Sequence, residues 1–238
     1  MDAKKKLVGY VFDIASLPAN RIEEIYSLRN RFFSPISRIN FDADLAKKHW
    51  VILLVDVLTG RARGFSTIRK VDVDFERESS IVFISGETII DPDFWGQLEL
   101  PRIWGRYVLQ MAMRQKDAKA YWLLITSSYR VYRFLPLFFR EYYPRRDRPT
   151  PPKIKRLLDY LASREFGSEY DPGRGIVRFS EPAPLRRDLI SISKRHLKDP
   201  EAVFFANANP HYAEGDELVC LAALNKQNLT AAALRILE

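Results

Sequence analysis

Alternating and periodic apolar positions along the chain predict a mixed α/β protein. The clearest strand spans residues 81–90, a run of β-branched and aromatic residues that ends at Asp91-Pro92. Successive side chains of a strand point to opposite faces. We therefore expect one face to carry the odd-numbered residues, which are Ile81, Phe83, Ser85, Glu87 and Ile89. Glu87 is the only charged member of that face.

Two further segments follow this strand. From Pro101 onward, apolar residues recur every three or four positions, which predicts a helix with Arg102 and Arg106 on its opposite side. The short apolar run at 120–126 predicts a buried strand. A strand–helix–strand unit of this length requires a right-handed parallel crossover. We therefore expect 81–90 and 120–126 to be adjacent parallel strands that diverge at their C-terminal ends and leave a cleft.

The segments before this unit predict an antiparallel meander with two helices. Apolar runs bounded by turn residues predict strands at residues 7–12, 50–55 and 65–73. Amphipathic periodicity predicts a helix at 21–33. Residues 42–48 predict a second, shorter helix with Asp42 as its N-cap. The strand at 81–90 then extends the meander.

Regular structure is also predicted after the parallel unit. An aromatic helix at 129–143 is expected to bend at Pro136 and to stop at Pro144. The next stretch, 145–152, is too rich in proline for regular structure and acts as a connector. The later elements are a helix, two strands and a terminal helix, expected at residues 153–166, 176–179, 217–224 and 228–237. We expect one domain over residues 1–238, with a C-terminal extension after about residue 145.

Composition narrows the class of protein. At 238 residues, with 47% hydrophobic and 13% aromatic residues, the chain is long enough to bury a core of its own. A single cysteine, Cys220, excludes an internal disulfide and lies in an apolar run typical of a buried strand. The three histidines are scattered without metal-ligand spacing, so we expect no metal. No uncharged apolar stretch approaches the ~20 residues that span a bilayer, and we expect a cytoplasmic protein without a transmembrane segment.

The order of these elements resembles the GNAT superfamily of acyl-coenzyme-A-dependent N-acyltransferases. The resemblance covers roughly residues 7–143. It rests on the segments Gly86-Glu87-Thr88-Ile89-Ile90-Asp91-Pro92, Trp95-Gly96-Gln97 and Trp122-Leu123-Leu124-Ile125-Thr126-Ser127-Ser128-Tyr129. It implies an α/β (α+β) fold, a mixed and mostly antiparallel twisted sheet with helices on both faces and a splayed parallel strand pair in the middle. It also implies transfer of an acyl group from a thioester to an amine, with an amino acid as one candidate acceptor.

The resemblance gives roles to individual residues. Glu87 matches the glutamate that accepts the proton of the amine, a role that suits a carboxylate in a largely apolar cleft. The alternative is a glutamate that merely faces solvent. Contacts with an acyl-CoA or acyl-phosphopantetheine donor are expected from Ile89, Ile90, Gln97, Arg102, Arg106, Thr126 and Ser127. Contacts with the acceptor are expected from Tyr129, Tyr132 and Arg133. Ser127 and Ser128 could instead cap the helix that starts at Tyr129.

Two places depart from the superfamily's pattern. Its phosphate loop has small residues that let backbone N–H groups at a helix N-terminus approach the phosphate, whereas this chain has Leu100 and Arg102 there. Arg102 and Arg106 could pair with a phosphate directly. Phe139 stands where a tyrosine often protonates the leaving thiolate. Both departures leave room for a phosphopantetheine donor on an acyl-carrier protein, as used by long-chain N-acyl amino acid synthases and acyl-homoserine-lactone synthases.

Charge gives one further indication of a partner. The chain carries 38 Lys and Arg against 30 Asp and Glu, a net +8. Seven of the basic residues lie between positions 140 and 156, where only two acids occur, and we call these seven the basic cluster. Its members are Arg140, Arg145, Arg146, Arg148, Lys153, Lys155 and Arg156. Such a cluster suits the docking of an acidic acyl-carrier protein, and a solvated loop is the alternative. A nucleic-acid surface is less favoured, since no recognition helix accompanies it. A GNAT-shaped binding protein without turnover is a further alternative.

Overall fold

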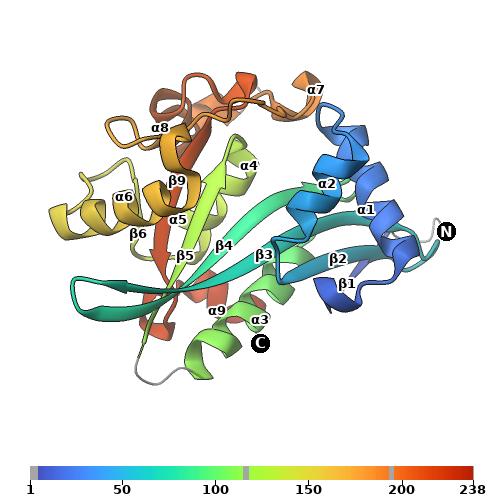
Figure 1. Cartoon of the computed structure of the whole chain (residues 1–238), viewed down its shortest axis with the longest axis horizontal. Coiled ribbons are helices and arrows are strands. Elements are labelled where there is room, and N and C mark those ends of the chain that lie inside the picture. The colour runs from blue at the N-terminus through green and yellow to red at the C-terminus, as the bar shows by residue number, and fades with distance from the viewer. Residues whose placement is uncertain (1–4, 115–117, 193–195, 238) are drawn as a thin grey trace.

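One twisted sheet organises the part of the chain that the computed structural model describes, which is residues 5–114, 118–192 and 196–237. Within these residues its nine strands follow the order β1-β2-β3-β4-β5-β9-β8-β7, and β6 pairs with β9. All neighbours are antiparallel except β4 and β5. Helices lie on both faces of the sheet (Figure 1). The predicted fold class is confirmed.

The first four strands form the predicted antiparallel meander. They are β1 (Leu7–Asp13), β2 (Trp50–Asp56), β3 (Ala62–Phe75) and β4 (Glu78–Ile90). β3 and β4 are longer than expected and meet in a tight turn at Glu76 and Arg77. The φ angles of these two residues are 48° and 65°, and such left-handed turns match the twist of a hairpin.

β4 and β5 (Lys119–Thr126) are adjacent and parallel, as predicted. Helix α3 (Glu99–Arg114) lies between them in the chain and begins before Pro101. The pairing ends at Ser85 with Leu124, although β4 continues to its last residue, Ile90. Beyond that pair the two strands point apart (Figure 1). The predicted divergence at their C-terminal ends is confirmed.

A β-bulge interrupts β4 where it leaves β5. Residues 66 and 68 of β3 pair with Thr88 and Ser85, so Gly86 and Glu87 together oppose the single residue Thr67. One extra residue reverses the alternation of faces along the strand. Glu87 therefore lies on the face opposite to Ser85, where α1 packs. The prediction that Glu87 and Ser85 share a face is wrong.

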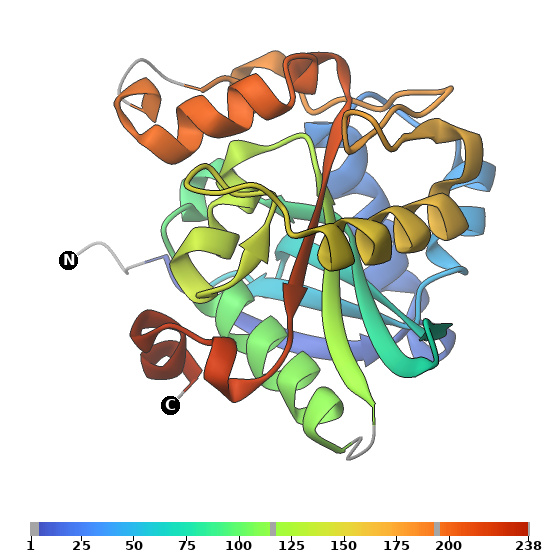
Figure 2. The same cartoon turned by 90° about the vertical axis from the view of Figure 1, so that its left-hand side faces the viewer.

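The helices bury apolar stripes against the two faces of the sheet. α3 and α9 (Ala231–Leu237) cover one face and lie side by side (Figure 2). α1 (Ala19–Phe32) and α2 (Arg38–Leu45) cover the other face over β2 and β3. α6 (Pro152–Phe166) covers that same face over β4, β5 and β9, and it ends at Gly167 as predicted.

Helix α2 begins earlier than the sequence predicts. Its N-cap is Ser37, whose Oγ accepts a hydrogen bond from the backbone N–H of Asn40 at 3.2 Å. Asp42 lies inside the helix, where its carboxylate pairs with Arg38 at 2.8 Å. The predicted cap at Asp42 is wrong, because Ser37 already satisfies a free N–H of the first turn.

The aromatic segment after β5 is not one helix. It forms two short helices, α4 (Tyr129–Tyr132) and α5 (Phe134–Phe138), followed by the strand β6 (Tyr142–Tyr143). Pro136 has no N–H to donate to the preceding turn, which explains a break near the predicted bend. β6 pairs with β9, and this long-range pairing decides its conformation. The prediction of a helix up to residue 143 is therefore wrong.

The C-terminal part completes the sheet. β9 (Glu217–Ala223) pairs antiparallel with β5, and β8 (Ile176–Val177) and β7 (Tyr170–Asp171) extend the sheet beyond it. Both predicted late strands are present, although β8 is shorter than expected. Two more helices, α7 (Arg187–Ile190) and α8 (Pro200–Ala208), lie between β8 and β9 in the chain. Short 3₁₀ turns occupy Ile14–Ser16, Pro92–Phe94, Gly167–Glu169, His196–Lys198, Tyr212–Glu214 and Lys226–Asn228.

Cys220 is fully buried in β9, as the sequence predicts for a small apolar side chain. No helix in the ranges given above combines the length and the apolar character that crossing a membrane requires.

Candidate active site

Three cavities meet where β4 and β5 separate. Thr88 of β4 and Val131 of α4 line all three of them. Their volumes are about 530 Å³, about 300 Å³ and about 50 Å³. On this edge β4 has no strand partner after Ser85 among the described residues, so its backbone faces the cavities, although the carbonyl of Ile90 accepts a hydrogen bond from Trp95 Nε1 at 2.8 Å. The cleft that the divergence of the strands predicts is thus present.

The largest cavity is an acidic cleft between the ends of α2 and α6. Its lining carries six acids against three bases, on a chain of net +8. The acids are Asp44, Glu87, Glu165, Glu169, Glu181 and Glu217, and the bases are Lys47, Lys48 and Arg69. A cleft with this excess attracts cations, and an amine is a cation before it loses its proton.

Glu87 enters the acidic cleft from the bulge in β4. Its side chain is 29% exposed, whereas that of its partner, Arg29 of α1, is only 2% exposed. Arg29 Nε donates a hydrogen bond to Glu87 Oε1 at 3.0 Å, and the same guanidinium donates to the carbonyl of Ser34. Burial raises the pKa of Glu87 above its ordinary value, and Arg29 only partly offsets that rise. Glu87 is therefore an oriented carboxylate with an increased affinity for a proton.

Glu217, which no sequence pattern singles out, lines the same cleft from the start of β9. Burial raises the pKa of Glu217 to about 8, the neighbouring Glu87 adds to the rise, and Lys48 opposes it. Among the described residues its carboxylate has no ion-pair partner. The sequence carries no signal for this arrangement, because only the pairing of β9 with β5 brings Glu217 to the cleft.

The second cavity is a turn cleft, bounded by the end of β4, residues 95–98 and α4. Ile89, Ile90, Gln97 and Arg133, four of the predicted ligand-contacting residues, meet there. The side chain of Gln97 is engaged elsewhere, since its Oε1 accepts the backbone N–H of Leu7 at 2.9 Å. Gln97 thus ties the N-terminal strand to the turn.

Arginines give the turn cleft a positive lining. Arg130 of α4 and Arg133, directly after α4, line it, and no acid does so within the described ranges. The Arg130 guanidinium lies 3.9 Å from the centre of the Trp95 ring, a cation–π contact that holds it over the turn. The sequence offers Arg130 and Arg133, one turn apart on a predicted helix, either as contacts for a substrate carboxylate or as side chains that extend into water. The lining favours an anionic group.

The structure places Arg102 and Arg106 away from these clefts. Neither lines any of the three cavities. Arg102 Nη1 pairs with Glu99 at 3.0 Å, and Arg106 Nε donates to the carbonyl of Leu237 at 3.0 Å. These residues follow the turn in sequence, but the helix directs them toward solvent and toward α9.

The predicted acceptor-binding tyrosines also lie outside the three cavities. Tyr129 Oη donates to Asp199, and Tyr132 Oη lies 3.5 Å from a Glu201 oxygen. Both rings are buried against α8, and this burial raises the pKa of each phenol. Neither tyrosine lies with Glu87 in the acidic cleft, whereas Arg133 lines the turn cleft.

Thr126 and Ser127 line the acidic cleft rather than the turn cleft. Thr126 Oγ1 accepts the backbone N–H of Ser128 at 2.9 Å. Ser128 occupies the N-cap position of α4, but its side chain makes no capping hydrogen bond. The two hydroxyl groups expected at the donor therefore stand on the side of Glu87.

Comparison with known proteins returned similar folds. No family profile matches the chain, and no curated protein matches its sequence. Among solved structures, the GNAT family N-acetyltransferase YhbS from Escherichia coli, in complex with CoA, matches with a TM-score of 0.42 and 15% identity over 56% of this chain and 70% of that chain. An Enterococcus faecalis protein of unknown function, named as a probable N-acyltransferase, matches with a TM-score of 0.42 and 13% identity over 92% of this chain and 66% of its own.

A third solved structure with a similar fold is Naa50 from Arabidopsis thaliana, in complex with a bisubstrate analogue of CoA. It has a TM-score of 0.38 and 10% identity over 60% of this chain and 92% of that chain. Similarity at this level extends to the fold alone.

Ion pairs neutralise most of the basic cluster. Six of its seven side chains pair with an acid, and the acids are Glu76, Glu78, Glu141, Asp147, Asp159 and Glu201. The seventh, Arg140, donates to the carbonyl of Leu229. Glu78 also pairs with Lys119, so eight bases against six acids leave a charge of +2, where the sequence alone counts +5. The cluster is much less positive than it looks in the sequence.

No group of His, Cys, Asp and Glu in the described part of the chain is arranged to hold a metal ion.

Proposed function

We propose that this protein transfers an acyl group from a thioester to an amine at the place where β4 and β5 separate. One observation carries the proposal. The bulge in β4 directs Glu87 into the acidic cleft, beside the edge of β4 that has no strand partner. A proton acceptor and a free strand edge are thus next to each other, which is what attack of an amine on a bound thioester requires.

The acidic cleft suits the acceptor. An ammonium ion is attracted by the excess of carboxylates, but only the neutral amine is a nucleophile. Glu87 accepts the proton, directly or through one water, as the amine nitrogen attacks the thioester carbon and the carbon–sulfur bond then breaks. The raised pKa of Glu87 makes it a stronger base than an exposed glutamate.

The turn cleft suits the donor. The amide groups of a pantetheine arm can hydrogen-bond to the edge of β4 between Ser85 and Ile90, as an added strand would, up to the carbonyl of Ile90 that Trp95 Nε1 already occupies. Arg130 and Arg133 can hold its phosphate. Phosphopantetheine occurs in both coenzyme A and acyl-carrier proteins, so the proposal covers both donors.

Glu87→Gln tests the proposed reaction. With acyl-CoA and a panel of primary amines, we expect turnover to fall roughly 10²–10⁴-fold, the range for removal of a general base. In the unmodified protein kcat/KM should rise with pH through the pKa of Glu87, above the ordinary 4.5 of a glutamate, because only the ionised form accepts a proton. In Glu87→Gln, kcat/KM should not show this rise with pH. Glu181→Gln, an exposed acid of the same cleft, is the matched control.

Unchanged turnover in Glu87→Gln would make Glu87 structural and end the proposal. Absence of any acyl transfer, with pantetheine thioesters still bound, would favour a binding protein without turnover.

The donor is tested by charge reversal in the basic cluster. Arg145, Arg146 and Arg148 replaced by Glu should slow transfer from an acyl-carrier protein in a salt-sensitive way if that protein is the donor, and should leave acyl-pantetheine unaffected. Transfer from the acyl-carrier protein that this variant does not slow would favour coenzyme A. The ion pairs of these arginines with Asp147, Glu201 and Glu141 require a melting curve as a control for folding.

A further inference from the structure

We infer that the third cavity, an apolar pocket between α3, α5 and α9, binds the alkyl chain of the acyl group, and that α9 limits the length of that chain. The inference rests on the proposed function and specifies its donor. The donor would then carry an alkyl chain longer than an acetyl group.

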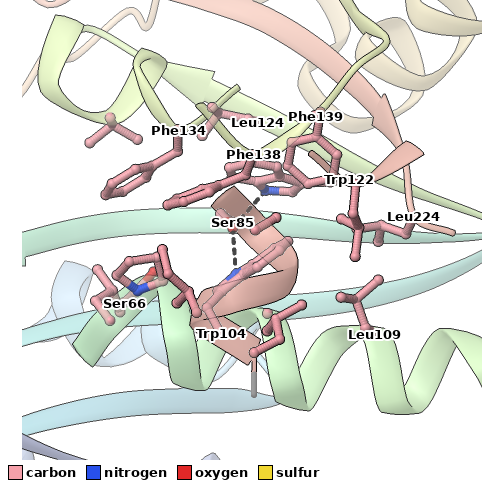
Figure 3. Close-up of a pocket in the computed structure, with 18 of the residues that line it drawn as sticks. Ser66, Ser85, Trp104, Leu109, Trp122, Leu124, Phe134, Phe138, Phe139 and Leu224 are labelled. Carbon is pink, nitrogen blue, oxygen red and sulfur yellow. Dashed lines mark hydrogen bonds between the residues drawn. The ribbon is translucent and has the colours of Figure 1, made fainter. Parts of the chain in front are cut away.

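Apolar side chains form almost the entire wall of the pocket (Figure 3). The strands and α3 contribute Trp122, Leu124, Trp104 and Leu109, and α5 and its end contribute Phe134, Phe138 and Phe139 (Figure 3). Its volume of about 50 Å³ is much smaller than that of either cleft, so it is narrow. A narrow apolar space excludes polar groups and favours a slender ligand.

The few polar groups of the pocket bind one another. Ser85 Oγ accepts hydrogen bonds from Trp104 Nε1 at 3.2 Å and from Trp122 Nε1 at 2.9 Å (Figure 3). The hydroxyls of Ser66 and Thr88 lie 2.8 Å apart and share a hydrogen bond. Both indole N–H groups are therefore satisfied without a ligand. What these residues offer a ligand is apolar contact.

The pocket opens where the reaction is proposed to occur. Ser85 is the last residue of β4 that pairs with β5, and it lines both the pocket and the acidic cleft. Thr88 and Val131 line the pocket and both clefts. A thioester carbon near Thr88 would thus have the amine on one side, the pantetheine on another and the pocket as the remaining direction for its alkyl chain.

Helix α9 forms one wall of this pocket through Ala233, Ile236 and Leu237. It packs closely on α3, since a Cβ at Gly105 would lie 2.8 Å from Leu237 Cδ2. The hydrogen bond from Arg106 to the carbonyl of Leu237 holds the same contact. Ala233 is buried while Ala231, on the same helix, is exposed. A larger side chain at Ala233 would therefore take up free space in the pocket.

Binding of S-alkyl thioethers of coenzyme A, from ethyl to decyl, tests the inference without catalysis. Trp104 and Trp122 line the pocket, so a bromine at the end of the chain should quench tryptophan fluorescence. We expect affinity to rise roughly 3- to 4-fold for each added methylene until the pocket is full, as apolar burial predicts. Affinity that is independent of chain length would overturn the inference.

Ala233→Phe should fill the pocket, and Ala231→Phe on the exposed side is its matched control. We expect Ala233→Phe to remove the advantage of decyl over ethyl, with ethyl binding retained, and the control to keep both. Equal weakening of ethyl and decyl would contradict a chain-binding role. Leu237→Ala enlarges the pocket instead and should shift the preferred chain to a longer one, so a folding failure of Ala233→Phe leaves the inference testable.

The two proposals fail in different ways. Chain-dependent binding without transfer to any amine would leave the pocket assigned and remove the acyltransferase. Transfer of an acetyl group without chain-dependent binding would support the acyltransferase and remove the assignment of the pocket.

Discussion

At the scale of single residues, two carboxyl groups share one cleft but differ in surroundings. Glu87 has a buried arginine as its partner, and Glu217 has no ion-pair partner among the described residues. At neutral pH the pKa of about 8 keeps Glu217 mostly protonated. Glu87 can then ionise without a negative charge on Glu217, which supports its role as the base.

Glu217 also makes stability depend on pH. Its pKa is about 8 in the folded protein against 4.5 for the ordinary group. Below about pH 4.5 the group is protonated in both states, so it does not change the free energy of unfolding. Between these values the unfolded chain has released a proton that the folded chain keeps. The cost therefore grows as pH rises and is complete above about pH 8.

Glu217→Gln should remove this cost, because its amide does not ionise. We expect the variant to gain on the order of 1–3 kcal/mol over the unmodified protein at about pH 9, and to differ little at about pH 5. Chemical denaturation at both pH values measures the difference. An equal change at both would show that packing, and not ionisation, is responsible.

At the scale of elements, the bulge in β4 decides which way the base points. It pairs Gly86 and Glu87 with Thr67, and Gly86 has little free space there. A Cβ at Gly86 would lie 2.4 Å from Thr67 Oγ1. This hydroxyl is buried and has no hydrogen-bond partner within the described residues. The bulge therefore requires glycine at position 86 of β4 and leaves little room for a larger side chain at position 67 of β3.

Gly86→Ala should disturb the bulge and move Glu87. We expect a loss of about 1–3 kcal/mol of stability, typical of overpacking, and a drop in acyl transfer larger than that loss explains. Thr67→Ala removes the atom that the new methyl group meets and breaks no hydrogen bond. The double variant should recover much of the stability and activity. Simple additivity of the two changes would contradict the proposed contact.

At the scale of the whole molecule, charge is distributed unevenly. The chain is basic overall, yet with Glu217 protonated the lining of the acidic cleft still has five ionised acids against three bases, a charge of −2, and the basic cluster is largely neutralised by its ion pairs. The strongest electrostatic selection therefore acts at the cleft. Cationic acceptors should reach it faster than neutral ones of the same size.

An amino acid and its methyl ester test this selection, because the ester lacks the negative carboxylate. We expect kcat/KM for the cationic ester to fall roughly 2- to 10-fold between low and physiological ionic strength, and that for the zwitterion to change less. Glu181→Gln should reduce the salt dependence, and Glu76→Gln, at the distant β3–β4 turn, should not. Equal salt dependence for both acceptors would contradict steering by the cleft.

The sequence by itself determined the elements whose signals are local. Period-two alternation and turn residues marked β1, β2 and the start of the β4–β5 unit, and the length of the crossover made those two strands parallel. The cleft followed from that unit, whereas the role expected of Glu87 came from the resemblance to the GNAT superfamily. Ligand contacts of Ile89, Ile90, Gln97 and Arg133 were expected with that resemblance, and the structure has these four residues lining one cleft.

Only the tertiary structure decided features that depend on a distant partner. The face of Glu87 follows from one extra residue opposite Thr67, and Glu217 reaches the cleft through the pairing of β9 with β5. β6 is a strand because β9 lies beside it. The charge of the basic cluster depends in part on acids that are remote in sequence, such as Glu78 and Glu201. Sequence patterns report the nearest few residues, whereas strand register, ion pairing and burial are set by contacts across the whole chain.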